Sequence, residues 1–341
     1  MTVTYLFRAP GTGHSIEELF GSIRHETDRR ESVTTHEIRL PYVSRSLGDL
    51  WRNYRFVRRQ SLGDIVHITG DAHYVALVLP GSRTALTIHD CVTLERNRNR
   101  PIRYALFWLL WFYWPVCRAG VVTAPSEKTR RELICYLGRV AEKIVVVPNG
   151  YDPAFTFQPK PFRTDRPVLL QPGTAPHKNL SRLIEAIDGI VCTLVIIGPL
   201  PDEVVADLRK HQITYRNYVD LSRAEIVQHY VDCDIVTFVS TYEGFGMPIL
   251  EANAVGRAVI TSDIAPLRDV AGEAAHLVDP GDVTAIRRGI LQLIQDDAYR
   301  QALIDAGRQN ARRYTVANAA AHYATLYRQF VPDPLLTEPA R

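Results

Sequence analysis

The sequence contains little that would indicate a disulfide framework or a structural metal module. Its 341 residues include five cysteines, an odd number, and none of them forms a Cys-x-x-Cys pair. Disulfide frameworks are indicated by an even number of cysteines and structural zinc sites by Cys-x-x-Cys pairs, so this usage argues against both and favours a reducing compartment. The N-terminus has no charged start followed by a long apolar run, and we therefore expect no signal peptide.

Long hydrophobic runs are also scarce. The longest is YALFWLLWFYWPVC (104–117), and it is uninterrupted only from Tyr104 to Trp114. That is far short of the roughly 20 residues that span a bilayer. Two interpretations stay open: a buried core helix, or a helix whose Trp and Tyr side chains enter a membrane interface. Four arginines precede the run and are compatible with the second interpretation: Arg96, Arg98, Arg100 and Arg103.

The charge balance is close to neutral overall but uneven along the chain. The formal net charge is +3, yet basic residues exceed acidic ones in residues 1–150 and acidic ones prevail afterwards. Such a basic half either binds an anionic partner or membrane surface, or is simply rich in Arg on its helix surfaces. With 46% hydrophobic and 23% charged residues the composition is that of a soluble globular protein, and the length favours two domains.

Short β-rich runs alternate with helical patterns, which predicts an α/β fold with parallel sheets. Strands are expected at 3–7, 64–69, 84–89, 120–125 and 143–148, and then at 167–172, 193–198, 234–240, 258–263 and 274–280. Helices are expected at 15–28, 126–138, 179–187, 201–211, 247–254, 282–296, 298–314 and 316–330. The proline-rich stretch 149–167 reads as a linker between two domains. Ligands of such sheets bind beyond the carboxyl ends of the strands.

The segment STYEGFGMPILEANAVG (240–256) follows one of these strands. Pro248 suits the first turn of a helix, where backbone N–H groups form an anion site. Gly244 and Gly246 would let the backbone approach a ligand closely. Glu243 and Glu251 suit the hydroxyls of a sugar or ribose, although both could equally serve only to cap the helix.

A second loop, GTAPHKNL (173–180), follows the expected strand at 167–172. Lys178 stands directly before a helix start, which is typical of a phosphate cradle. The spacing is not that of a P-loop. Gly173 and Thr174 open this loop.

Three further features lie near expected strand ends. The loop with Gly11, Gly13 and His14 follows the first strand but lacks the dinucleotide-binding spacing. His89 ends the strand at 84–89 and is either a core histidine or a site residue. Asp232-Cys-Asp234 has the form of a metal-binding motif, but it precedes its strand, and we expect no metal there.

Taken together, residues 240–282 resemble the retaining nucleotide-sugar glycosyltransferases of family 4. GTAPHKNLSRLIEAI, IVVVPNGYD, LTIHD and VTAPSEKTRREL resemble other segments of the same family. The resemblance implies the GT-B fold, two Rossmann-like parallel-sheet domains that face each other across a cleft. The domains would be 1–155 for the acceptor and 156–314 for the nucleotide-sugar, with 315–341 as a helix crossing back and a tail.

The resemblance also implies roles for individual residues. Lys178 would bind the diphosphate, Glu243 the donor sugar and Glu251 the ribose, and His89 would lie near the sugar. Glu243, Lys178 and His89 would thus be the catalytic residues. The donor would contact Gly173, Thr174, Lys178, Glu243, Gly244, Phe245, Gly246, Met247, Pro248 and Glu251. Gly11, Gly13 and His14 would line the donor and acceptor site.

The expected function is a metal-independent, hexosyltransferase-type reaction without a cofactor. A UDP- or GDP-sugar would be the donor and a carbohydrate or lipid-linked molecule the acceptor, in polysaccharide, lipopolysaccharide or glycolipid assembly. We expect no nucleic-acid partner and a cytoplasmic location with peripheral contact to an anionic membrane. Many family members carry Arg where this chain has Thr174, and Arg8 is a candidate substitute. The alternatives are a GT-B-fold sugar-nucleotide epimerase and a non-catalytic carbohydrate- or nucleotide-binding scaffold.

Overall fold

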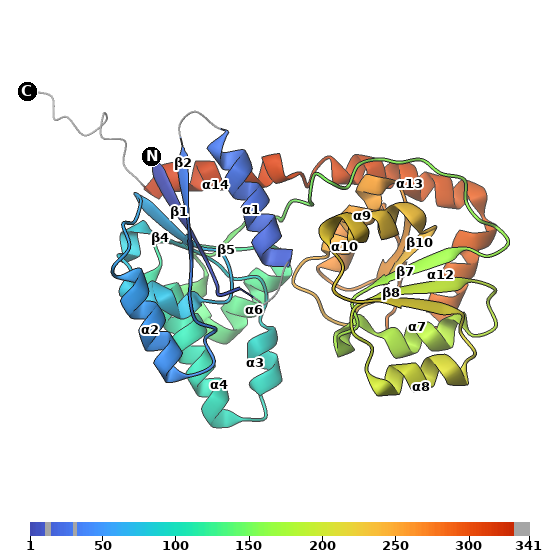
Figure 1. The fold of residues 1–341 in the computed structure, drawn as a ribbon, viewed down its shortest axis with the longest axis horizontal. Coiled ribbons are helices and arrows are strands. Elements are labelled where there is room, and N and C mark those ends of the chain that lie inside the picture. Colours follow the sequence, from blue (N-terminus) through green and yellow to red (C-terminus); the bar gives the residue numbers. More distant parts are fainter. Residues whose placement is uncertain (11–14, 30–32, 331–341) are drawn as a thin grey trace, which may run out of the picture. The chain divides into compact units, whose positions relative to one another are not determined.

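The computed structural model describes residues 1–10, 15–29 and 33–330 and divides the chain into two compact α/β units. The first unit is Met1–Gly150 together with the chain from Val316 onward, and the second is Tyr151–Thr315. The sequence placed these boundaries at 155/156 and 314/315. Figure 1 traces both units along the chain. The chain thus leaves the first unit once, forms the second, and comes back to the first with its last helix.

Six parallel strands form the sheet of the first unit, in the spatial order β2-β1-β3-β4-β5-β6. The strands are β1 (Thr2–Phe7), β2 (Thr34–Arg39), β3 (Ile65–Ile68), β4 (Thr84–Thr87), β5 (Val121–Ala124) and β6 (Val145–Val146). β3, β4 and β5 are buried along their whole length and contain no charged residue, which suits strands that are covered on both faces. The strand order reverses between β1 and β3. Sheets of this type bind ligands at such a reversal, beyond the carboxyl ends of the strands.

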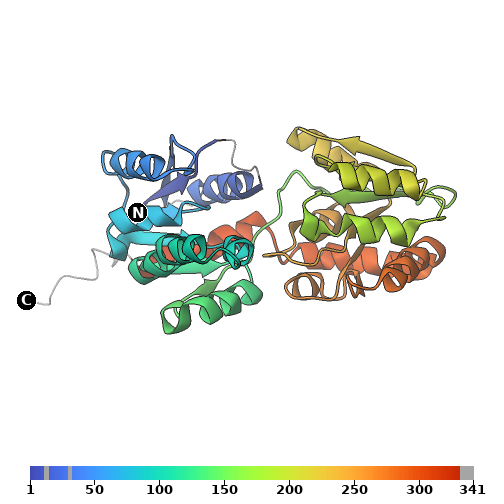
Figure 2. The same ribbon diagram turned by 90° about the horizontal axis from the view of Figure 1, so that it is seen from below.

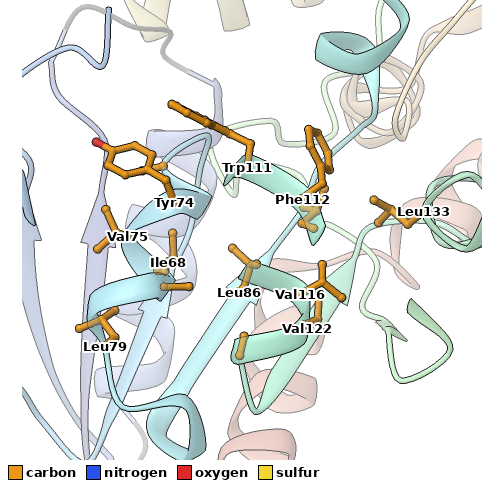
Figure 3. Close-up of a cluster of buried hydrophobic side chains, with 14 of the residues drawn as sticks. Ile68, Tyr74, Val75, Leu79, Leu86, Trp111, Phe112, Val116, Val122 and Leu133 are labelled. Carbon is orange, nitrogen blue, oxygen red and sulfur yellow. The ribbon is translucent and has the colours of Figure 1, made fainter. Parts of the chain in front are cut away.

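Alternate side chains of these strands face two helical layers. Val3, Tyr5 and Ile65 pack with helices α1 (Ser15–Asp28) and α14 (Val316–Phe330). Leu6 and Val66 belong to the cluster on the other face. That face is covered by α2 (Leu47–Val57), η1 (His73–Val78), α3 (Val92–Asn97), η3 (Trp108–Tyr113), α5 (Trp114–Arg118) and α6 (Glu127–Leu137). Figure 3 shows this second cluster between the strands and the helices.

The Trp-rich segment forms α4 (Pro101–Phe107), the π-helical η3 and α5 in succession. Trp111 and Phe112 are buried, and the Trp111 ring lies 4.8 Å from that of Tyr74 in η1. Ile102 and Leu106 of α4, in contrast, are 78% and 51% exposed. The middle turns of the segment therefore pack into the core, whereas its first turns expose apolar side chains to solvent. Within the described part of the chain, no helix combines the length and the hydropathy that crossing a membrane requires.

A buried polar network ties α14 to the sheet of the first unit. His67 of β3 bonds the Tyr327 hydroxyl through Nδ1 (2.5 Å) and the Thr87 hydroxyl through Nε2 (2.7 Å). The Tyr323 hydroxyl lies 3.2 Å from the same Thr87 oxygen. Buried polar groups need such partners, so the network fixes where α14 docks.

The second sheet also has six parallel strands, in the order β12-β11-β10-β7-β8-β9. The strands are β7 (Val168–Pro172), β8 (Thr193–Ile197), β9 (Tyr215–Tyr218), β10 (Ile235–Phe238), β11 (Ala258–Ser262) and β12 (His276–Val278). This is the Rossmann order, with its reversal between β7 and β10. The loops after β7 and β10 carry the two segments that the sequence singled out, and they flank that reversal.

Helices cover both faces of this sheet. On one face α8 (Asp202–Lys210), α7 (Leu180–Ile187) and α12 (Val283–Gln295) lie in a row, as Figure 2 shows. On the other face lie α9 (Arg223–Asp232), α10 (Met247–Val255) and α11 (Leu267–Ala271), while α13 (Asp297–Ala311) packs along α10. Leu169 and Ile235 point to the first layer and Leu170 and Val236 to the second.

The proline-rich stretch before β7 is fastened to the second unit. Lys160 Nζ lies 2.6 Å from a carboxylate oxygen of Asp234, at the amino end of β10. Arg257 donates to the carbonyl of Gln158 at 2.9 Å. These bonds explain why nearly all of this stretch belongs to the second unit.

Candidate functional site

The loops after β7 and β10 are joined to each other by hydrogen bonds. The Thr241 amide donates to the His177 carbonyl at 2.8 Å. The Asn179 side-chain amide donates to the carbonyls of Val239 (3.0 Å) and Pro280 (2.7 Å). Because β7 and β10 are neighbours in the sheet, both loops leave it at the same edge. The two segments predicted to bind one ligand are therefore parts of one surface.

Lys178 and Glu243 form an ion pair across these loops. Lys178 Nζ lies 2.7 Å from Glu243 Oε1, and the two side chains are only 17% and 14% exposed. The ammonium also lies 4.6 Å from the centre of the Phe238 ring, within cation–π distance. His177 Nε2 lies 3.9 Å from the same carboxylate oxygen. A cation and an anion thus stand side by side where a phosphate and a hydroxyl of one ligand could each find a partner.

Glycine is required at two turns of this surface. Gly173 has a φ of +95°, and a Cβ there would come within 3.1 Å of Lys178 Cε. Gly246 has a φ of +135°, and its Cβ would lie 2.9 Å from Leu267 Cδ2. Both values of φ lie in a region that side chains rarely adopt, so each turn depends on glycine. Thr174, which opens the first loop after Gly173, donates its hydroxyl to the Pro199 carbonyl at 2.6 Å.

Helix α10 begins in this loop. Its N-cap is Gly246, which offers no side-chain cap, and Pro248 stands in its first turn. Residues 249–255 are all buried, which fixes the helix against the sheet. The positive end of the helix dipole therefore adds to the charge of Lys178 at this edge. Met247 supplies the first helical residue, and Phe245 is buried just before it.

Glu251 lies one turn into α10 in a different set of contacts. It is buried, and Arg223 Nη2 of α9 lies 3.4 Å from its Oε1. Arg223 Nε in turn bonds Asp152 Oδ2 at 2.8 Å. Burial raises the pKa of Glu251, while Arg223 and a hydrogen bond from Tyr230 oppose this rise. The sequence singled out Glu251 as a candidate but not Arg223, whose local signal is the capping box that Ser222 and Glu225 form at the start of α9.

The remaining predicted residues belong to the first unit. His89 follows β4, its Nε2 bonds the Thr69 carbonyl at 2.8 Å, and burial lowers its pKa, so the ring is neutral at neutral pH. Arg8 follows β1 and is held by both carboxylate oxygens of Glu17, at 2.5 and 3.2 Å. Gly11, Gly13 and His14 lie outside the described residues.

The Asp232-Cys-Asp234 motif has a structural role. Asp234 accepts from the Val168 amide at 2.7 Å and pairs with Lys160, so it anchors the start of β7. Residues 1–10, 15–29 and 33–330 contain no group of three or more His, Cys, Asp or Glu side chains arranged to hold a metal ion. All five cysteines are free thiols.

Two parallel-sheet units with these strand orders, carried by one chain, form the fold of the GT-B class. The solved structure of HepE from Anabaena in complex with UDP and glucose shares it, with a TM-score of 0.75 at 18% identity over 96% of this chain and 99% of that one. A model described as Glycosyltransferase Family 4 matches residues 3–155, and one described as Glycosyl transferases group 1 matches residues 154–310. The chain belongs to this family of group 1, family 4 glycosyltransferases.

Two curated relatives are mannosyltransferases. O-antigen chain mannosyltransferase B of Escherichia coli is 31% identical over 166 residues, which are 45% of this chain and 43% of that protein. MMP alpha-(1->4)-mannosyltransferase of Mycolicibacterium hassiacum is 27% identical over 271 residues, 72% of this chain and 65% of that protein. The match therefore spans less than half of the first relative and somewhat under two thirds of the second.

Proposed function

We propose that this protein is a retaining glycosyltransferase that moves a hexosyl unit from a UDP- or GDP-sugar to an acceptor hydroxyl. The observation that carries the proposal is the Lys178–Glu243 pair beside the glycine-capped start of α10. The site combines two features that a nucleotide-sugar needs, a cationic edge for the diphosphate and carboxylates for the diols. The names of the relatives favour an acceptor in polysaccharide, lipopolysaccharide or glycolipid assembly, and HepE was solved with UDP and glucose.

In this proposal the diphosphate competes with Glu243 for the ammonium of Lys178. Once Lys178 and the N–H groups of α10 bind the phosphates, the Glu243 carboxylate is released to accept hydrogen bonds from the sugar. Glu251 accepts from the ribose hydroxyls. Because these donors neutralise the charge that develops on the leaving diphosphate, we propose that the reaction needs neither a metal ion nor a cofactor.

The chemical step is a front-side displacement. The bond from the anomeric carbon to the diphosphate oxygen breaks while the acceptor oxygen bonds to the same face of that carbon. The acceptor proton passes to the departing phosphate oxygen. A retaining hydrolase would instead place two carboxylates about 5–5.5 Å apart around the bond, and Glu243 is paired with Lys178 rather than with a second carboxylate.

Nucleotide release with and without an acceptor tests the reaction class. We expect UDP or GDP release from a panel of UDP- and GDP-hexoses to depend on added alkyl glycosides, and the product to keep the anomeric configuration. Donor isomerisation without an acceptor would instead identify an epimerase, and nucleotide binding without turnover a scaffold. EDTA should leave the rate unchanged, whereas a strict requirement for Mg²⁺ or Mn²⁺ would overturn metal independence.

We also propose that the first unit contacts the anionic cytoplasmic face of a membrane. Leu47 and Trp51, one turn apart on α2, are 77% and 60% exposed, and Arg55 stacks on the Trp51 ring at 5.4 Å. Ile102 and Leu106 stand one turn apart on α4, next to the exposed Arg103. Apolar side chains bordered by arginines suit a surface of anionic lipid headgroups.

Vesicle flotation tests this contact. The protein should float with vesicles that contain phosphatidylglycerol, and the double variant Leu47→Ser/Trp51→Ser should float less. Val191→Ser is the matched control, because Val191 is 62% exposed but lies in the second unit. Equal flotation of the double variant and the control would contradict the proposed membrane contact.

A further inference from the structure

Arg223 lies between two carboxylates that come from distant parts of the chain. It is the first residue of α9, and its Nε bonds Asp152 Oδ2 at 2.8 Å. Its Nη2 lies 3.4 Å from Oε1 of Glu251 in α10. The bond to Asp152 is the shorter one, so Asp152 anchors the guanidinium. Its terminal Nη2 atom faces the Glu251 carboxylate.

Aromatic rings hold this arginine in place. The guanidinium carbon lies 4.6 Å from the centre of the Phe155 ring. Phe155 in turn packs edge-on against Tyr230, with ring centres 5.1 Å apart, and Tyr230 hydrogen-bonds Glu251. Asp152, Phe155 and Tyr230 thus leave the guanidinium little freedom. A preorganised donor of this kind orients its acceptor without losing much side-chain entropy at the moment of binding.

Glu251 keeps capacity for a ligand in this arrangement. An ionised carboxylate offers about four acceptor positions. Among the described residues, Tyr230 and Arg223 are its hydrogen-bonding partners, and the contact with Arg223 is long. The remaining positions suit two adjacent hydroxyl groups. A protonated Glu251 would lose part of this capacity, and burial favours the protonated form. Arg223 opposes that effect.

We infer that Arg223, anchored by Asp152, positions the Glu251 carboxylate for the two hydroxyls of the donor ribose. Arg223 is a positioning residue in this scheme, because it acts on the nucleotide through Glu251. The inference rests on the proposed function, since it requires that the second unit binds a nucleoside diphosphate.

The test compares a ribonucleotide with an analogue that lacks the diol. Calorimetry measures the Kd of the full chain for UDP and GDP, and for the 2′,3′-dideoxy form of whichever binds. In the wild type the ribonucleotide should bind at least tenfold more tightly than its dideoxy form. Arg223→Gln should reduce this ratio to near one by weakening ribonucleotide binding alone. Arg223→Lys, which keeps the charge, should restore part of it.

A second anchor variant and a matched control separate positioning from general damage. Asp152→Asn should lower the ratio, because it frees the guanidinium without touching Glu251. Arg308→Gln removes an exposed arginine of the same unit that also lies over an aromatic ring, Phe157, at 3.9 Å. This control should leave the ratio unchanged. Because the ratio cancels losses common to both nucleotides, partial unfolding of a variant would not mimic the expected result.

The pH dependence adds a readout that a purely structural role would not move. The charged and titratable groups facing Glu251 are Arg223 and Tyr230 from α9 and Asp152 before the second sheet. Without Arg223, the pKa of Glu251 should rise further, so the ratio in Arg223→Gln should recover as the pH increases.

The possible outcomes are distinct. A wild-type protein that binds neither UDP nor GDP would overturn the proposed function. Binding with a wild-type ratio near one would contradict the ribose role of Glu251. An Arg223→Gln variant that keeps the wild-type ratio would overturn the present inference and leave the proposed function standing.

Discussion

Lys178 and Glu243 are 65 positions apart in the chain but 2.7 Å apart in the fold. Neither residue identifies a site alone, because a lysine at a helix start and a glutamate in a glycine loop are both common surface features. Because both are partly buried and lie at the reversal of the strand order, the two residues together indicate a candidate site. A pair that is already formed also holds each side chain near the position in which a ligand would meet it.

Lys178→Ala should reduce turnover about 100-fold, which corresponds to roughly 3 kcal/mol of lost stabilisation of the leaving group. The measurement is acceptor-dependent nucleotide release at saturating donor, with thermal unfolding as a check on the fold. Lys210→Ala is the matched control, because Lys210 is an exposed lysine at the end of α8. Turnover equal to that of the control would exclude Lys178 from the reaction.

Single residues also mark the limit of sequence reasoning. Gly173, Gly246 and Lys178 could be singled out as candidates because each stands in a short loop directly after a strand. Arg223 was not, since its role depends on contacts with Asp152 and Glu251, which lie 71 and 28 positions away. Contacts over such separations are decided by packing between helices and leave no local pattern.

At the scale of elements, an apolar sequence separates the strands that were predicted from those that were missed. β1, β3, β4 and β5 are interior strands with apolar runs, and the sequence predicted all four. β2 and β9, with the sequences TTHEIR and YRNY, are edge strands and were missed. An edge strand has one neighbour and more exposure, so it does not need an apolar sequence. The helix expected at 126–138 is α6, with Ser126 as its N-cap and Gly138 as its C-cap.

The glycine at the start of α10 allows a prediction at this scale. Gly246→Ala should destabilise the second unit by about 1–3 kcal/mol, because the φ of +135° disfavours a side chain and the new Cβ would crowd Leu267. Urea unfolding followed by circular dichroism measures this loss. Gly21→Ala is an informative comparison, since Gly21 is inside α1 with open space around it. That change should stabilise by about 0.5–1 kcal/mol. Equal effects of both changes would contradict the strain at Gly246.

At the scale of the whole molecule, the first unit is built from both ends of the chain. His67 and Tyr327, joined by a 2.5 Å hydrogen bond, are 260 positions apart. The sequence predicted the final helix and, through the family resemblance, its return to the first domain. It did not predict the network that receives this helix, because His67 looks like one polar residue within an apolar strand. Acid stability should reveal this network.

Burial lowers the pKa of His67 to about 3, from an ordinary value of 6.5. Between these values the unfolded chain binds a proton that the folded chain excludes. The free energy of unfolding should therefore fall as the pH drops from 6.5 toward 3, by up to about 1.4 kcal/mol per pH unit from this group. His73 and His89, whose pKa values burial also lowers, should add to the slope with the same sign. His67→Gln can keep a hydrogen bond but cannot titrate. It should make the slope shallower by up to about 1.4 kcal/mol per pH unit, the contribution of one proton. Urea unfolding at a series of pH values from 4 to 8 measures both slopes, and identical slopes would show that His67 is not held neutral beneath α14.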